Sequence, residues 1–211
     1  MVPTAGFFFS SHIANTTNLS FNWLIQGSGS DPLAVSLVLE RTHGYLPRQR
    51  KILAFITKIL SGGQTGADRA ALDAAIFCGF AYGGAIPAGR KTEAGPLSDD
   101  YRMEELASDR YPDRTQKNVQ AADGTLILSH GELSGGSALT GRIAESEGKP
   151  CLHIDFHETP LPQAEARVIP WLRKHRIRIL NVAGPRASSD PKIYDQAYAL
   201  IVSLLQVNHG C

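Results

Sequence analysis

Short apolar runs alternate with amphipathic helical patterns from residue 52 to the end of the chain, and three of the runs stop at a turn that contains glycine. Each apolar run has the length of a strand, and each following segment is long enough for a helix that crosses back over a sheet. Strands that alternate with helices in this way favour a parallel sheet. The pattern therefore predicts an α/β fold of the Rossmann-like, doubly wound kind, with a mainly parallel five-stranded sheet and helices on both faces.

The bounds of the predicted elements follow from these runs. We expect strands at 52–61, 82–86, 125–129, 151–156 and 178–183, and helices at 67–78, 113–122, 137–147, 163–174 and 191–206. Pro170 lies inside the fourth helix and is expected to kink it or divide it in two. Residues 87–110 form a long polar segment, which we expect to be a functional or mobile loop, and its acidic residues at 99–105 are expected in a solvated helical turn.

The first fifty residues have a different composition from the rest of the chain. Residues 1–30 contain no Lys, Arg, Asp or Glu and are rich in Ser, Thr, Asn and Gly. A secretory signal would begin with basic residues and a mitochondrial presequence would contain arginines, but the first arginine is Arg41. We expect residues 1–50 to be a disordered or loosely attached leader, or a mis-assigned start, and residues 51–208 to be the ligand-binding domain. A genuine extension that packs on the domain remains the alternative.

Charge and cysteine content exclude several classes of protein. The chain has 21 Lys and Arg against 20 Asp and Glu, a formal charge of +1, which argues against nucleic acid as the main partner. Its three cysteines, Cys78, Cys151 and Cys211, have no spacing typical of a disulfide framework or a zinc knuckle, so a reducing cytoplasm fits best. No apolar stretch reaches the roughly 18 to 20 residues that a membrane-spanning helix needs, so no membrane partner is expected.

Three glycine turns supply the candidate ligand-binding residues. In an open parallel sheet, ligands bind outside the carboxyl ends of the strands, where these turns are expected. Glycine lets the backbone approach a ligand closely, and the first N–H groups of the next helix favour an anion. The alternative is that the glycines only close strand-to-helix turns. The candidates are Gly62, Gly63, Gln64, Thr65 and Gly66, with Asp68 just beyond; Ser134, Gly135, Gly136 and Ser137; and Gly184 with Arg186.

Arginines near these turns could neutralise a bound phosphate, since a guanidinium group can bind two oxygens at once. Arg114 and Asn118 are four residues apart and share a helix face, while Arg90 lies in the long loop and Arg186 in the third turn. Arg114 and Asn118 could equally be ordinary surface residues. Hydrogen bonds to a charged group contribute about 1.5 to 3 kcal/mol each. Association costs about 4 to 15 kcal/mol, which offsets most of the free energy from a few such hydrogen bonds, so phosphate alone would bind weakly. We therefore expect the ligand to be a heterocycle that carries a phosphate.

Other familiar sites fit the sequence less well. Gly66 is followed by Ala67 and Asp68 rather than by the lysine of a Walker-type phosphate loop, and the three-glycine dinucleotide motif is missing. ATP hydrolysis and NAD-linked chemistry are therefore not expected. The alternating His153, Asp155 and His157 could hold zinc or iron on one strand face, but solvated strand-end residues are the preferred interpretation, and we predict neither a metal site nor a catalytic residue.

Five segments together resemble the molybdenum cofactor carrier family, a branch of the lysine-decarboxylase-like Rossmann superfamily. They are ILSGGQTGADRAALDAAI, AIPAGRKTEAGPL, YPDRTQKNV, DGTLILSHGELSGGSALT and LNVAGPR, and the resemblance covers residues 57–205. It implies a homo-oligomer that holds the phosphate of a molybdopterin-type cofactor and protects or delivers it, with a molybdoenzyme or a cofactor-synthesis protein as a possible partner. By position, the family's phosphate loops fall on residues 62–66 and 134–137, and on Thr140.

The same superfamily also contains enzymes that cleave the base from nucleoside monophosphates. Their motif is Gly-Gly-x-Gly-Thr with a catalytic Glu two residues further on, whereas here Gly136 is followed by Ser-Ala-Leu-Thr and the next acid is Glu145. A binding or carrier protein is therefore favoured over an enzyme. The phosphoribohydrolase and a nucleotide-binding sensor remain as alternatives.

Overall fold

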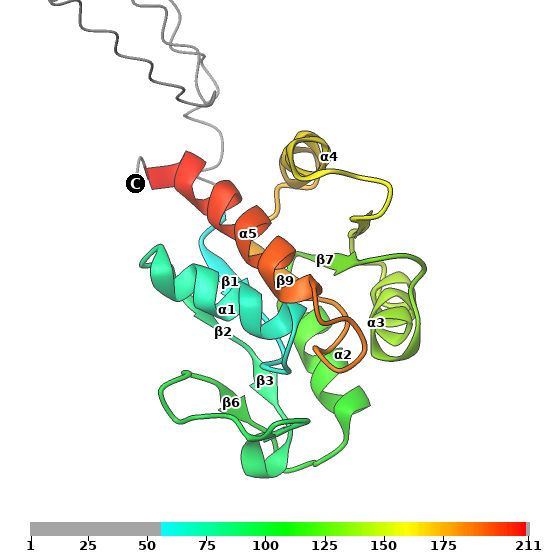
Figure 1. Ribbon diagram of the computed structural model, residues 1–211. Helices are drawn as coiled ribbons and strands as arrows, with labels where there is room; N and C mark the ends of the chain where they lie inside the picture. Colours follow the sequence, from blue (N-terminus) through cyan, green and yellow to red (C-terminus); the bar gives the residue numbers. More distant parts are fainter. Residues whose placement is uncertain (1–55, 210–211) are drawn as a thin grey trace, which may run out of the picture. The chain divides into compact units, whose positions relative to one another are not determined.

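Five parallel strands form the central sheet of the protein, whose computed structural model describes residues 56–209, with side chains to residue 206 (Figure 1). The expectations for residues 1–50 and for Cys211 lie outside the described residues. Each strand is hydrogen-bonded in parallel register to its neighbours, so the predicted α/β class and sheet are confirmed. In spatial order the strands are β2 (Tyr82–Gly83), β1 (Lys58–Leu60), β9 (Ile179–Ala183), β7 (Gly124–Ser129) and β8 (Cys151–Asp155).

Helices connect the strands and cover both faces of the sheet. They are α1 (Ala67–Phe77), α2 (Tyr111–Ala121), α3 (Gly135–Ser146), α4 (Leu161–Lys174) and α5 (Ile193–His209). The crossovers β1–α1–β2 and β7–α3–β8 run in opposite directions along the sheet, so their right-handedness puts α1 and α3 on opposite faces. Helix α5 packs against α1 and α4, and α2 packs against α3.

The core follows the alternation of side chains along the strands. In β7, Leu126 and Leu128 belong to the cluster that contains the buried faces of α1, α4 and α5. Ile127 is also fully buried but points to the opposite face, where its Cδ1 lies 3.6 Å from the Cβ position of Gly141 in α3. Because both faces of β7 are covered, all six of its residues are buried, and the apolar residues at its centre, 126–128, are consecutive rather than alternating.

The small-residue face predicted for the first helix allows α1 to lie close to the sheet. Ala67, Ala70, Ala71, Ala74 and Ala75 are all fully buried. Proline does not divide α4, which runs without interruption from Leu161 to Lys174 with Pro170 inside it. Its buried stripe of Ala164, Val168 and Leu172 continues on both sides of the proline and fixes both parts to the core.

Two other expectations are corrected. The predicted strand at 82–86 is split into β2, in the main sheet, and β3 (Ala85–Ile86), which pairs with β6 (Glu104–Glu105). Asn118 holds Ala85 just beyond this break, since its side chain accepts from the N–H of Ala85 at 2.7 Å and donates to the Ala85 carbonyl at 3.2 Å. Glu104 and Glu105 are therefore in a strand and not in a helical turn.

The rest of the long segment is tied into turns. A short 3-10 turn, η2 (Ala88–Arg90), is followed by the hairpin of β4 (Lys91–Thr92) and β5 (Gly95–Pro96). No helix within residues 56–209 is long and apolar enough to cross a membrane.

Candidate functional site

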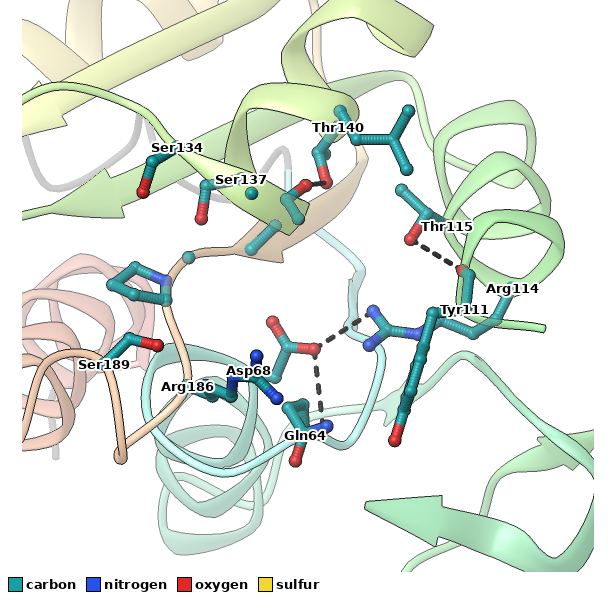
Figure 2. A pocket seen from close by; sticks show the side chains of 16 residues that line it. Gln64, Asp68, Tyr111, Arg114, Thr115, Ser134, Ser137, Thr140, Arg186 and Ser189 are labelled. Atoms are coloured by element: carbon teal, nitrogen blue, oxygen red, sulfur yellow. Dashed lines mark hydrogen bonds and ion pairs between the residues drawn. The ribbon is translucent and has the colours of Figure 1, made fainter. Parts of the chain in front are cut away.

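A cavity of about 290 Å³ opens at the carboxyl ends of β1, β7 and β9, where the three glycine turns meet (Figure 2). At this crevice the helices that follow the neighbouring strands β9 and β7 lie on opposite faces of the sheet, which is where a doubly wound fold is expected to bind ligands. Its lining is contributed by all three turns and by the first turns of α2 and α3. The lining residues are Gln64, Asp68, Tyr111, Arg114, Thr115, Ser134, Gly135, Gly136, Ser137, Leu139, Thr140, Ala183, Gly184, Pro185, Arg186 and Ser189.

The start of α3 presents unpaired N–H groups to this cavity. The first residues of a helix have no partner within it, and the first bond of helical spacing here runs from Ala138 N–H to the Ser134 carbonyl at 3.2 Å. Within the described residues, no hydrogen bond takes up the N–H groups of Gly135, Gly136 and Ser137. A Cβ atom added at Gly136 would meet nothing within 4 Å, so the space above this helix end is open. The site thus offers convergent donors and the positive end of a helix dipole.

The start of α1 is closed by contrast. Ala67 N–H donates to the Pro185 carbonyl at 3.3 Å, and a Cβ added at Gly66 would lie 2.4 Å from the same oxygen. The first and third turns therefore pack directly on each other, and Gly66 is required for that close approach, with φ at +74°. The carboxylate of Asp68 compensates the positive end of α1 from within the helix.

Asp68 and Arg114 form a buried ion pair on the cavity wall. Arg114 Nη1 donates to Asp68 Oδ2 at 3.1 Å, and Figure 2 shows the arginine reaching from α2 toward the carboxylate. Burial raises the pKa of the Asp68 carboxyl above its usual value, and the Arg114 charge opposes that rise. Gly62 makes room for the pair, because a Cβ there would lie 1.7 Å from Arg114 Nη1.

Arg186 is the more exposed arginine of the cavity. Its side chain is 56% exposed, and its Nε lies 3.6 Å from Glu93 Oε2. Glu93 also accepts hydrogen bonds from the hydroxyls of Thr65 and Ser188. Burial pushes the pKa of the Glu93 carboxyl up, but these hydrogen bonds and Arg186 outweigh it, so the pKa lies below its usual value. Glu93 lies between β4 and β5 and therefore fastens this hairpin to the first and third turns.

The structure brings many of the predicted site residues together but not all of them. Gln64, Asp68, Arg114, Ser134, Gly135, Gly136, Ser137, Thr140, Gly184 and Arg186 line the cavity, whereas Gly62, Gly63, Thr65, Gly66, Arg90 and Asn118 do not. The Arg90 guanidinium is held in its own loop by the carbonyls of Leu97 and Tyr101, at 2.7 and 2.9 Å. Asn118 holds β3.

Sequence reasoning missed two residues of α2 that line the cavity, Tyr111 and Thr115. They lie four residues apart and so share a face of the helix, and Arg114 lies within one turn of both. The Arg114 guanidinium carbon lies 5.9 Å from the Tyr111 ring centre. The helical spacing around Arg114 was the signal that could have identified them.

A second cavity of about 390 Å³ adjoins the first and was not predicted. The two share Ser134, Ser137, Pro185 and Ser189. The other lining residues of the second cavity are Ser129, His130, Glu132, Leu133, His157, Asp190, Pro191 and Lys192. The start of α3 therefore lines both of these adjoining cavities.

The histidines of β8 and the loop after it make local contacts. His153 Nε2 lies 2.7 Å from the Ser129 hydroxyl, and burial lowers the pKa of His153. Asp155 Oδ1 accepts the N–H groups of Gly131 and His157, at 2.7 and 2.9 Å, which lowers the pKa of this carboxyl. Across residues 56–209, no group of three His, Cys, Asp or Glu side chains is placed to hold a metal ion.

Comparison with known proteins places the chain among related sequences. The circularly permuted YpsA SLOG family matches residues 59–205. A crystal structure of a protein from Syntrophus aciditrophicus SB, named "putative molybdenum carrier protein", is 51% identical, with a TM-score of 0.68, and the match covers 72% of this chain and 94% of that one. A search of curated proteins finds no match.

Proposed function

The chain belongs to the circularly permuted YpsA SLOG family, and on that basis we propose that it binds and carries a phosphorylated pterin, with the molybdenum cofactor as its cargo. The observation that carries this proposal is the open start of α3. Three backbone N–H groups, at Gly135, Gly136 and Ser137, have no hydrogen-bond partner within residues 56–209 and belong to the lining of a cavity at the point where a doubly wound fold binds ligands. The name of the Syntrophus protein supports the choice of cargo.

The charges around the first cavity refine the roles of its arginines. Arg114 is committed to Asp68, so it supports the wall and contributes little free positive charge to a ligand. Of the two arginines, Arg186 is the more exposed, and its Nε lies 3.6 Å from the nearest carboxylate oxygen of Glu93. We assign the phosphate to the N–H groups of α3 and charge neutralisation to Arg186.

A carrier in the cytoplasm would bind its cargo as a homo-oligomer and pass it to a molybdoenzyme or a cofactor-synthesis protein. Such a role requires slow release and shielding from water and oxygen rather than chemistry on the ligand. The hairpin fastened by Glu93 is the segment that lies beside the first cavity and could limit access to it.

The test is to purify the full chain without air from cells that make molybdenum cofactor. Bound molybdenum is measured by elemental mass spectrometry, and bound pterin by mass spectrometry and by fluorescence after oxidation. We expect both in one constant ratio to protein. Titration of the stripped protein with the cofactor should then give saturable binding, and absence of saturable binding would overturn the proposal.

Two variants at one position localise the phosphate. Gly136→Asp places a carboxylate in the open space above the helix end and should abolish cofactor binding through charge repulsion. Gly136→Ala adds only a methyl group to that open space and should bind within about threefold of the unaltered chain, a difference of under 1 kcal/mol. Gly136 is preferred to Gly135, whose φ of +49° would add backbone strain to the comparison. Equal binding by both variants would remove α3 from the site.

A further inference from the structure

The second cavity can receive another part of a ligand whose phosphate lies at the start of α3. Ser134 and Ser137 belong to the lining of both cavities, so a group bound there is adjacent to each. The second cavity, at about 390 Å³, has room for a bicyclic ring. This inference rests on the proposed function, because it takes the phosphate position from it.

Aromatic side chains give the second cavity a firm wall. His130 Nδ1 lies 2.8 Å from Asp190 Oδ2, and the two side chains are only 11% and 14% exposed. The His130 ring centre is 5.1 Å from that of His157 and 5.8 Å from that of Phe156. A ring fixed by a carboxylate and by neighbouring rings is a preformed surface for a flat heterocycle.

The two carboxylates of this cavity differ in what remains free for a ligand. Asp190 is committed at both oxygens, since Oδ2 meets His130 and Oδ1 accepts the N–H of Lys192 at 3.3 Å. Glu132 is exposed, and none of the hydrogen bonds or ion pairs found in residues 56–209 involves its side chain. Lys192 lines the same cavity, and its side chain forms none of the ion pairs found in this part of the chain.

We propose that Glu132 recognises a 2-amino-4-oxopyrimidine ring, the edge that pterins share with guanine. This edge carries a ring N–H beside an amino group, and an ionised carboxylate has two acceptor oxygens that match this pair of donors. The carbonyl oxygen on the ring carbon next to the N–H accepts a hydrogen bond from Lys192. Adenine presents a ring acceptor in place of the N–H, so it cannot make the same pair of bonds to a carboxylate. Glu132 is thus a specificity-determining residue for the heterocycle.

The experiment uses stable nucleotides as probes for the shared edge. The full chain, stripped of bound ligand, is titrated calorimetrically with GMP, IMP, AMP and inorganic phosphate. We expect GMP to bind about tenfold or more tightly than AMP, which is the range for one bidentate pair. IMP has the ring N–H but no 2-amino group, so it should lie between them.

Variants assign the preference to the carboxylate. Glu132→Gln should reduce the GMP preference over AMP to within about twofold and leave inorganic phosphate binding unchanged, since an amide offers only one acceptor in place of two. Glu158→Gln, an exposed glutamate outside both cavities, is the matched control and should keep the full preference. Lys192→Met should weaken GMP binding and spare phosphate. Because Glu132 and Lys192 are exposed, neither change should affect folding.

The outcomes separate this inference from the proposed function. Equal binding of GMP and AMP, or a GMP preference that survives Glu132→Gln, would overturn the role of Glu132 while phosphate binding at α3 stands. Failure of both GMP and AMP to bind would also overturn the role of Glu132, whereas the proposed function is overturned only if the cofactor titration shows no saturable binding. Loss of GMP preference in Glu132→Gln alone, with phosphate affinity unchanged, is the supporting result.

Discussion

Arg114 and Asp68 join the start of α2 to the start of α1 through one hydrogen bond of 3.1 Å, with only 12% and 4% of their side chains exposed. An ion pair removed from water in this way adds little to the stability of the protein, because the cost of desolvation offsets the attraction. Its role is instead to hold the two helices in position. The pair fixes the distance between the two helix starts that form one side of the first cavity.

Replacing Arg114, the partner of Asp68 in this ion pair, should destabilise the protein strongly. Arg114→Met leaves the Asp68 carboxylate buried without its partner, and we expect the free energy of unfolding to fall by about 3 to 5 kcal/mol at pH 8. Burial already raises the pKa of Asp68 and Arg114 opposes the rise, so the variant's carboxyl should titrate still higher. A raised pKa in the folded state gives stability at low pH that is lost as pH rises, so the loss should be smaller at pH 5 than at pH 8. Urea unfolding at both pH values measures it.

The control for this prediction lies on the same helix. Lys117 forms an exposed ion pair with Glu104 at 3.5 Å. Lys117→Met should change the free energy of unfolding by no more than about 0.5 kcal/mol at either pH. If Arg114→Met behaves like Lys117→Met, the Asp68 pair has no structural role.

Gly62→Ala should act through the same pair. The added methyl group would lie 1.7 Å from Arg114 Nη1, so the guanidinium must leave Asp68. We therefore expect Gly62→Ala to destabilise the protein and to add little further loss in the Arg114→Met background. A double-mutant cycle from urea unfolding gives this coupling. Gly141→Ala is the control, because its methyl group would meet Ile127 at an ordinary contact distance of 3.6 Å. If the losses of stability from Gly62→Ala and Arg114→Met simply add in the double variant, the prediction is wrong.

Local sequence patterns were sufficient to predict the sheet and the convergence of the turns. Strand ends and helix starts are encoded by neighbouring residues, so the turns at Gly63, Gly136 and Gly184 could be placed before the structure. Contacts between residues that are distant in the sequence could not be predicted from these local patterns. Arg90 was expected to face a ligand, but its guanidinium binds carbonyls of its own loop. Nothing in the spacing indicates that the Asn118 side chain would bind the backbone of Ala85, because side-chain pairing across 33 residues depends on the packed fold.

The hairpin β4–β5 should loosen when its connection to the turns is removed. Glu93 connects it to Thr65, Ser188 and Arg186, and its backbone N–H donates to Gln64 Oε1 at 2.9 Å. Glu93→Ala removes the side-chain contacts, so hydrogen exchange in residues 91–96 should speed up by about tenfold or more, while exchange in β7 stays unchanged. Hydrogen-exchange mass spectrometry makes the measurement. Glu105→Ala is the control, because among the described residues the Glu105 carboxylate accepts a hydrogen bond only from Gly89 N–H, at 2.6 Å. Equal effects of the two changes would show that Glu93 has no special role.

The pKa of the Asp155 carboxyl is shifted in the opposite direction to that of Asp68. Its carboxylate accepts the N–H groups of Gly131 and His157, and the bond from Gly131 is the main cause of its lowered pKa. A lowered pKa gives stability that is present above the unfolded value of 3.8 and is lost as pH falls through the folded pKa. Asp155→Asn keeps an acceptor oxygen but removes the charge, so it should cost about 1 kcal/mol at pH 7. That difference should shrink as pH falls below 4, and a difference independent of pH would contradict the assignment.

Cleavage of nucleoside monophosphates is not expected from this chain. The first acid after the second glycine turn, Glu145, is exposed on α3 and lines neither cavity, so it is not placed to protonate or activate a group bound at the start of that helix. GMP and AMP incubated with the purified chain should therefore remain intact, as judged by chromatography of the free base. A known phosphoribohydrolase run beside it shows that the assay detects turnover. Release of base at catalytic rates that is abolished by Asp190→Asn would instead assign the chemistry to the His130–Asp190 pair of the second cavity.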